Sequence, residues 1–347
     1  MLAIVNILQI YLIINLTQVM NIGIIGYGVM GKTRKTAIDE IKRGTITAVS
    51  EPNAGPEVDG IPNLSHDEII NDPNIDVLVV CTPNFLNKEL TIKGLNAGKH
   101  VFCEKPPAFT AADMEEIIEV EKRSGKKLMY GFNHRHHDSV IHMKRLIHSN
   151  EYGKVLWVRG RYGKSVTKDY FNQWRAKKEL AGGGILMDQG IHMLDLFLFL
   201  TGDYDIVKAE VSNLYWHMDV EDNAFVILKE SATGKVASLH STMSQWRHLF
   251  SLEIFLEKGY MVLNGLITST MSYGEETLSI AKNRSTAPAA TWKDEVITKY
   301  VNNNSWRYEM DHFFDAIDGN GPVAIGNSGD ALKLMRIIDK VYEQKDF

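Results

Sequence analysis

A short stretch in the middle of the chain carries two carboxylates and a histidine at helical spacing. Asp188 and His192 are four residues apart, so they share one face of a helix, and Asp195 lies one further turn along it. Apolar residues fill much of the remaining surface, which predicts a largely buried helix. A buried face with such groups is costly unless the groups have a role. The pattern favours acid–base chemistry, with a merely structural core histidine as the alternative.

Three glycines stand directly before this helix, at residues 182–184, and they allow the backbone to approach a ligand closely. Further polar groups follow two apolar runs, residues 75–81 and 100–103, that are typical of buried strands. The carboxyl ends of parallel strands form the ligand crevice of a doubly wound sheet. The side chains at these two strand ends are Thr82, Pro83, Asn84, Glu104 and Lys105. A lysine such as Lys105 at the end of a buried strand costs free energy unless its charge is paired or takes part in function. The alternative is a surface lysine where the strand ends.

A G-x-G-x-x-G motif follows the first apolar run, residues 21–26, and opens a helical pattern. In this context the first glycine permits a tight turn, the second lets the backbone approach a pyrophosphate, and the third lets helix and strand pack closely. The free N–H groups at the start of the helix then hold the phosphates. The residues of the motif are Gly26, Tyr27, Gly28, Val29, Met30 and Gly31.

Glu51 ends the second predicted strand, twenty residues after Gly31. A carboxylate at this place accepts both hydroxyls of the adenosine ribose and repels a 2′-phosphate, which indicates NAD as the cofactor. The neighbouring cations Lys32 and Arg34 keep NADP open as the alternative, because a cation can neutralise a 2′-phosphate. A solvated strand end is the structural alternative for Glu51.

Around these residues, strands and helices alternate over the first part of the chain. Strands are expected at residues 21–26, 45–50, 75–81, 100–103 and 127–131, with helices at 32–42, 87–97 and 111–124 between them. This order predicts a parallel sheet with right-handed crossovers, in a dinucleotide-binding domain over residues 21–137.

After about residue 138 the runs become longer and richer in aromatic residues, which predicts an antiparallel sheet. Its strands are expected at residues 155–162, 206–215, 224–229, 236–244 and 252–263, with strand and loop over 264–299 and closing helices at 306–317 and 330–342. The expected fold class is α/β: a doubly wound (Rossmann) parallel sheet, followed by an α+β domain over residues 138–347 with a mainly antiparallel open sheet. That second domain is expected to bind substrate and to mediate assembly.

Length and composition narrow the classes of function. The 347 residues suit two domains, and a net charge of −5 without a long run of Lys and Arg argues against a nucleic-acid partner. The two cysteines, Cys81 and Cys103, lie in apolar runs and suggest reduced thiols in a cytoplasmic protein. His134, His136, His137 and His142 fit no single helical or strand face, so no metal is expected.

Residues 1–20 contain no charged side chain and are mostly apolar. By length they could just span a bilayer, but the first strand starts without a spacer. We interpret the segment as lying upstream of a true start at Met20, so no membrane is expected as a partner. An extra helix packed on the domain and a membrane anchor are the alternatives.

The order and spacing of these motifs resemble the glucose–fructose oxidoreductase/inositol dehydrogenase (Gfo/Idh/MocA) family from Met20 onward. The resemblance also includes the runs at residues 97–101 and 131–135. It implies that Lys105 contacts the reacting hydroxyl, Asp188 orients the substrate and His192 takes the hydroxyl proton. It further implies cofactor contacts by Asn84 and Glu104, and substrate-side positions for Asn133 and Arg135. Many members carry a histidine where this chain has Asn87, which puts only a secondary cofactor-cleft contact in doubt.

The function expected from this resemblance is NAD(H)-dependent hydride transfer to or from a hydroxyl-bearing carbon of a sugar. A neutral base and a fixed cation beside a developing alkoxide suit that chemistry. Two alternatives stay open: an NAD-using glycosidase of the same fold, and a sugar-sensing regulator without catalysis.

Residues 164–178 combine lysines and arginine with aromatic side chains just before the glycine run, and Trp174 and Arg175 are its expected substrate contacts. Aromatic faces suit sugar C–H surfaces, and cations suit phosphate, which favours a nucleotide-linked or amino sugar. A solvated basic loop is the alternative. The second sheet carries apolar residues on both faces, as at residues 214–216 and 225–227, so a homo-oligomer, a dimer or tetramer, is expected.

Overall fold

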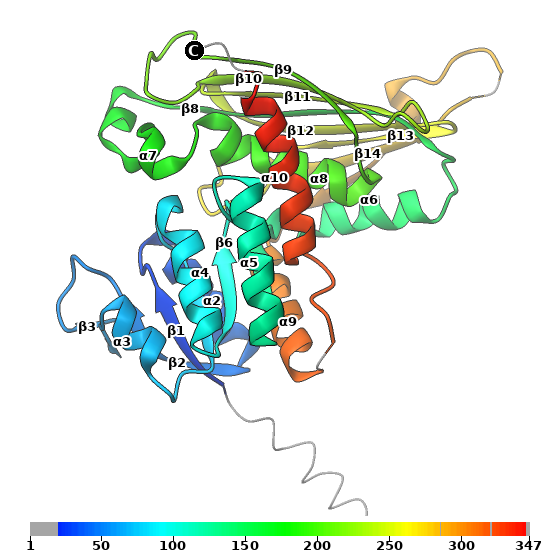
Figure 1. Cartoon of the computed structure of the whole chain (residues 1–347). Coiled ribbons are helices and arrows are strands. Elements are labelled where there is room, and N and C mark those ends of the chain that lie inside the picture. Colours follow the sequence, from blue (N-terminus) through cyan, green and yellow to red (C-terminus); the bar gives the residue numbers. More distant parts are fainter. Residues whose placement is uncertain (1–19, 285, 320, 345–347) are drawn as a thin grey trace, which may run out of the picture.

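The computed structural model describes residues 20–284, 286–319 and 321–344, which form two layered parts stacked on each other (Figure 1). The interpretations of residues 1–19 fall outside this described part. Figure 1 shows a compact sheet-and-helix part at the N-terminal end and a broad, open sheet above it, with helices between the two.

The N-terminal part is a five-stranded parallel sheet in the order β2-β1-β5-β6-β7. Its strands are β1 (Met20–Ile25), β2 (Gly44–Ser50), β5 (Val77–Val80), β6 (His100–Glu104) and β7 (Leu128–Gly131). Between them run α2 (Val29–Ile41), α3 (His66–Asn71), α4 (Asn87–Asn96) and α5 (Ala111–Ser124), and a two-stranded ladder of β3 (Glu57–Val58) and β4 (Ile61–Pro62). Short apolar strands buried on both faces are what a parallel sheet requires, and the predicted doubly wound sheet is confirmed.

The second part is an eight-stranded sheet in the order β15-β14-β13-β12-β8-β11-β10-β9. Neighbouring strands are antiparallel except for the parallel pair β8 and β11, so the predicted mainly antiparallel sheet is confirmed. Its strands are β8 (Val155–Ser165), β9 (Ile206–Ser212), β10 (Asn223–Lys229), β11 (Val236–Thr242), β12 (Ser244–Leu256), β13 (Gly259–Asn264), β14 (Glu276–Lys282) and β15 (Val296–Tyr300).

Helices α6 (Asp138–His148), α8 (Ile191–Thr201) and α10 (Ser328–Tyr342) cover one face of this sheet and separate it from the N-terminal part (Figure 1). Helix α9 (Ser305–Asp318) instead packs against α2, and its Phe313 and Phe314 join the core of the N-terminal sheet. The chain therefore returns to its first part after residue 300, and the boundary at residue 137 stays a prediction.

Several predicted strands differ in their bounds, and two of these differences have a clear physical reason. The run 252–263 is not one strand, because the chain turns between Leu256 and Gly259 and pairs β12 with β13 as a hairpin. The strand expected to reach residue 215 ends at Ser212. There the N–H groups of Leu214, Tyr215 and Trp216 donate to the Asp222 carboxylate instead of to a neighbouring strand.

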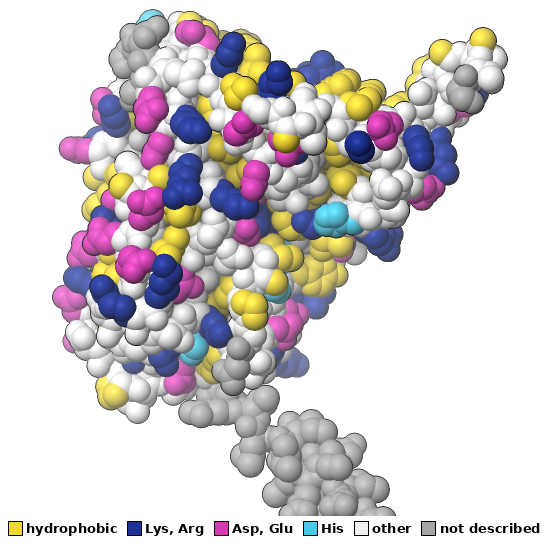
Figure 2. Space-filling view, turned by 45° about the vertical axis from the view of Figure 1, so that its right-hand side comes forward, with side chains coloured by type: hydrophobic (Ala, Val, Ile, Leu, Met, Phe, Trp, Pro, Cys, Tyr) yellow, Lys and Arg dark blue, Asp and Glu magenta, His cyan; other side chains and the backbone are white. Residues whose placement is uncertain are grey.

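Within the described part, one helical stretch, Lys178–Thr201, is long and apolar enough to cross a membrane. Most of it, 78% of the apolar window, is buried inside the protein, as expected for a core helix. The surface in Figure 2 mixes basic and acidic side chains over the face in view, without a broad patch of one sign.

Candidate active site

The turn between β1 and α2 has the geometry that a dinucleotide needs. Gly26 has a positive φ of 89°, and a Cβ there would lie 2.6 Å from the Cys81 carbonyl oxygen. A Cβ on Gly28, in contrast, would meet no atom within 4 Å, so this glycine leaves open space for a ligand. No side chain caps the start of α2, which leaves the N–H groups of its first turn available to phosphate. This turn therefore fits the pyrophosphate of NAD.

Glu51 follows β2 at the same edge of the sheet, and its backbone is held by Asn63 through hydrogen bonds of 2.9 and 3.1 Å. Among the described residues its carboxylate makes no hydrogen bond or ion pair, so it is available to ribose hydroxyls. The cations that kept NADP open are both engaged elsewhere. Lys32 lies 3.6 Å from the Asp59 carboxylate, and Arg34 is fully buried.

Arg34 sits between two buried carboxylates. Its Nε donates to Glu104 Oε1 over 2.7 Å, and its Nη1 lies 2.6 Å from Glu309 Oε2 on α9. One cation thus lies between two acids. Burial raises the pKa of Glu309 to about 8; the Arg34 cation opposes this shift, and the nearby Glu104 carboxylate adds to it. The Glu104 carboxylate therefore binds Arg34, and its expected contact with the cofactor stays a prediction.

Lys105 and Asp188 meet across the two parts of the molecule. Lys105 comes directly after β6, and its Nζ donates to the Asp188 carbonyl oxygen over 2.7 Å and lies 3.4 Å from Asp188 Oδ1. Asp188 stands in a π-helical turn, Leu186–Gly190, that precedes α8. The Glu221 carboxylate anchors this turn by accepting from the Leu186 N–H over 3.0 Å.

Two more cations surround the same carboxylate. Lys164, at the end of β8, binds Asp188 Oδ2, and Arg175 Nε lies 4.0 Å from Asp188 Oδ1. Burial alone would raise the pKa of Asp188, but Lys164, Lys105 and Arg175 together hold it well below its usual range. Asp188 is therefore ionised throughout the physiological pH range. No sequence signal singled out Lys164 from the other lysines of residues 164–178.

His192 lies in the first turn of α8 and stacks on His134, with ring centroids 3.9 Å apart. Burial, and next the charge of Lys105, lower the pKa of His192 well below its ordinary value. The ring is therefore neutral at neutral pH, as a proton acceptor must be. Its Nδ1 is buried and has no hydrogen-bond partner in the described part of the chain.

Asn133 holds His134 in place, and its expected substrate-side position stays a prediction. The Asn133 amide oxygen lies 3.1 Å from His134 Nδ1, and the Tyr162 hydroxyl lies 3.0 Å from His134 Nε2. The Asn133 amide also donates to Ser305 over 3.1 Å. The role of His134 has no local sequence signal, because only the fold brings its ring to His192.

Arg135 and Asp195 form a buried ion pair. The Arg135 guanidinium donates to both Asp195 oxygens, over 2.8 and 2.6 Å, and to Asp330 over 2.5 Å. Both partners in the Arg135–Asp195 pair are buried, so their charges serve each other here, and the substrate-side position expected for Arg135 stays a prediction. A π turn rotates less per residue than an α-helix, so α-helical spacing does not carry from Asp188 through to Asp195.

The Thr82-Pro83-Asn84 turn lies at the carboxyl end of β5, where cofactor contacts were expected. The Asn84 amide donates to the Ala181 carbonyl over 2.8 Å and so connects this turn to the segment before the glycine run. Asn87 is fully buried and donates to the carbonyls of Glu104 and Pro106, over 3.2 and 2.8 Å. The unusual asparagine therefore supports the backbone on either side of Lys105.

The predicted substrate contacts Trp174 and Arg175 lie next to each other on a short 3-10 turn, with the guanidinium 4.3 Å from the ring centroid. Arg175 reaches the Asp188 cluster, and Trp174 stands beside it. In the described ranges no group of three His, Cys, Asp or Glu side chains could hold a metal ion. The other histidines have separate surroundings: His136 lies near His312, His137 pairs with Glu276, and His142 pairs with Tyr300.

Two family models match the chain in order. Residues 20–132 match the oxidoreductase family, NAD-binding Rossmann fold, and residues 140–262 match the GFO/IDH/MocA C-terminal domain. The chain is 32% identical to levoglucosan dehydrogenase of Pseudarthrobacter phenanthrenivorans over 212 residues, which cover 56% of this chain and 54% of that protein. It is 26% identical to inositol 2-dehydrogenase of Salmonella typhimurium, over 89% of each chain.

Among solved structures, levoglucosan dehydrogenase in complex with NADH and levoglucosan superposes with a TM-score of 0.83 at 25% identity, covering 94% of this chain and 97% of that one. The NAD-binding turn, the Lys105–Asp188–His192 site and both matched domains lead to one conclusion: the chain belongs to the Gfo/Idh/MocA family of NAD-binding oxidoreductases.

Proposed function

We propose that this protein transfers a hydride between NAD(H) and a hydroxyl-bearing carbon of a sugar or cyclitol ring. The observation that carries the proposal is the meeting of Lys105, Asp188 and His192 between the edge of the NAD-binding sheet and α8. Bound NAD supplies the hydride acceptor, or NADH the donor. In the direction of oxidation, the protein itself must remove one proton from the hydroxyl and stabilise the negative charge that develops on its oxygen.

His192 is the group suited to take that proton, because its ring is neutral at neutral pH. Lys105 supplies a fixed positive charge next to the oxygen that develops negative charge. Asp188, ionised and held by three cations, fixes the Lys105 ammonium and offers its remaining hydrogen-bonding capacity to a second substrate hydroxyl. His134, stacked on His192 and fixed by Asn133 and Tyr162, keeps the base in one orientation.

We favour an uncharged ring over a phosphorylated one as the substrate. The expectation of a nucleotide-linked or amino sugar depended on free cations in residues 164–178. Of these cations, Lys164 and Arg175 contact Asp188, whose single carboxylate offsets part of their charge. The two relatives described above are named for levoglucosan and inositol, neither of which carries a phosphate. The nucleotide-linked sugar stays a prediction to be tested beside them.

The open face of the eight-stranded sheet supports assembly into a homo-oligomer. Phe225 and Ile227 on this face are 47% and 52% exposed. Trp157 stacks on Phe255, and Phe255 on Tyr260, with ring centroids 4.1 and 5.1 Å apart. A flat, aromatic face of this kind is stabilised when a second copy covers it. We place the protein in the cytoplasm, where the free thiols of Cys81 and Cys103 would stay reduced.

The proposed reaction predicts NADH formation with a neutral polyol ring. The assay offers NAD or NADP with myo-inositol, levoglucosan, glucose and UDP-sugars in turn, and follows absorbance of the reduced cofactor. NAD with at least one neutral ring should give product, because Glu51 repels a 2′-phosphate. Reduction with UDP-sugars alone would overturn the neutral-ring assignment. Cleavage of a glycoside without net NADH would favour the glycosidase alternative, and binding without any turnover would favour a sensor.

Replacing His192 with alanine should lower kcat by roughly 10²–10⁴-fold, the usual contribution of a general base, while NADH binding is retained. Steady-state kinetics and NADH fluorescence titration measure the two effects separately. His217→Ala, at an exposed histidine, is the matched control and should keep wild-type kcat. Full turnover by His192→Ala at neutral pH would show that another group takes the proton.

The open sheet face predicts a particle of at least two chains by light scattering at micromolar concentration. Ile227→Asp puts a charge on that face and should shift the mass toward one chain. Val301→Asp, at a valine that is 71% exposed and follows β15, should leave the mass unchanged. A wild-type monomer would contradict the proposed assembly.

A further inference from the structure

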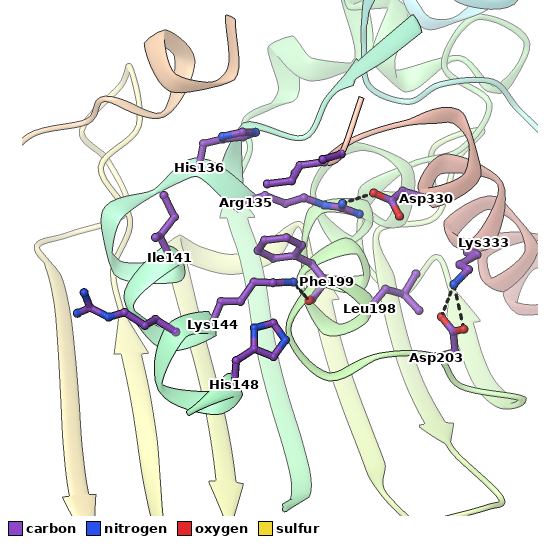
Figure 3. A pocket seen from close by; sticks show the side chains of 13 residues that line it. Arg135, His136, Ile141, Lys144, His148, Leu198, Phe199, Asp203, Asp330 and Lys333 are labelled. Atoms are coloured by element: carbon purple, nitrogen blue, oxygen red, sulfur yellow. Dashed lines mark hydrogen bonds and ion pairs between the residues drawn. The ribbon is translucent and has the colours of Figure 1, made fainter. Parts of the chain in front are cut away.

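A second cavity lies beside α8, away from the Lys105–Asp188–His192 site. Its volume is about 640 Å³, within the usual range for small-molecule sites. Helix α6, the C-terminal half of α8, the segment before α10 and the first turns of α10 surround it (Figure 3). His192 stands in the first turn of α8, whereas Leu198 and Phe199 near the other end of that helix line the cavity.

One wall of this cavity is apolar. Ile141, Leu198, Phe199 and Ile325 form it, and Leu198 and Phe199 are only partly buried although the helix that carries them is otherwise a core helix. Partly exposed aliphatic and aromatic side chains in a concave surface gain from contact with an apolar ligand group.

Next to this apolar wall the cavity carries a positive charge that has no ionic partner among the described residues. Lys144 on α6 lines the cavity and forms no ion pair there. The Lys144 ammonium donates to the Phe199 carbonyl oxygen over 2.7 Å and lies 3.5 Å from the centre of the Phe199 ring. This hydrogen bond holds the Lys144 ammonium at the cavity wall (Figure 3).

The two carboxylates at the cavity are already paired. Asp330 binds Arg135 over 2.5 Å, and Asp203 binds Lys333 over 3.0 Å (Figure 3). Burial, and next the neighbouring Arg135, lower the pKa of Lys144, while Asp330 and Asp195 oppose the shift. An anion bound beside Lys144 would give its ammonium the ionic partner that it lacks among the described residues.

We propose that this cavity binds a small organic anion, a carboxylate or phosphate group joined to an apolar ring or chain. The anionic group lies against Lys144, and the apolar part lies on Phe199, Leu198 and Ile141. His136 closes the cavity near Arg135. The site is separate from the cofactor turn and from the proposed substrate cleft.

The test uses phenyl phosphate as the probe and inorganic phosphate as the comparison. Isothermal titration calorimetry is carried out with protein saturated with NADH, which occupies the phosphate-binding turn at Gly28. Phenyl phosphate should bind more tightly than inorganic phosphate, because only phenyl phosphate covers the apolar wall. Equal affinity for both anions, or no binding of phenyl phosphate at millimolar concentration, would overturn the proposal.

Two variants locate the binding. Lys144→Met should weaken phenyl phosphate binding by about tenfold or more, as expected for the loss of a charge-assisted contact. Lys122→Met, at an exposed lysine of α5 outside the cavity, should bind as the wild type does. Unchanged affinity in Lys144→Met would contradict the site. If Lys144→Met does not fold, hydrogen exchange on the wild-type protein decides the question.

Hydrogen exchange on the wild-type protein provides a second readout that needs no variant. Phenyl phosphate should slow amide exchange in α6 and in the C-terminal half of α8. Protection confined to the β1–α2 turn or to residues 164–192 would assign the anion to the cofactor or substrate cleft and would refute the second site. These readouts measure binding, so their outcome does not depend on whether the proposed reaction is correct.

Discussion

The active site depends on one buried carboxylate, Asp188. An ionised carboxylate removed from water is unstable unless cations compensate it, and here Lys105, Lys164 and Arg175 do so. These three cations come from the end of β6, the end of β8 and the 3-10 turn that precedes the glycine run. The requirement to neutralise Asp188 therefore brings Lys105, 83 residues away in the sequence, to the same place as Lys164 and so joins both parts of the molecule. The same arrangement positions the Lys105 ammonium for its proposed role.

Two buried arginines, each paired with two carboxylates, keep the surrounding helices in place. Arg34 ties α2 to the end of β6 and to α9, and Arg135 ties the turn after β7 to α8 and α10. Residues 133–136 show how closely structure and site are connected. His134 stacks on His192, Arg135 clamps the helix that carries His192, and His136 reaches the second cavity. A displacement of this one turn would therefore change the stacking on His192, the position of α8 and the wall of the second cavity.

Much of this arrangement could be predicted from sequence because its signals are local. The glycine motif, the alternation of strands and helices, and the positions of Lys105, Asp188 and His192 depend on spacing within one element. The roles of Glu104, Arg135 and Asp195 could not be predicted in this way. Each is decided by a distant partner of opposite charge, such as Arg34, 70 residues from Glu104. Lys164 and His134 were not singled out for the same reason, since only the tertiary fold brings them to Asp188 and His192.

The central claim is that compensating cations, Lys164 among them, keep Asp188 ionised for the reaction. Its most direct test is the titration of the Asp188 carboxyl group, followed by 13C NMR, in Lys164→Met, with Lys164→Arg and the exposed Lys168→Met as controls. Loss of the Lys164 charge leaves burial less opposed, so the pKa of Asp188 should rise. The titration of this carboxyl group should then move upward by about one pH unit or more in Lys164→Met, and should stay in place in Lys164→Arg and Lys168→Met. A carboxyl titration at the same pH in Lys164→Met and the wild type would contradict the account.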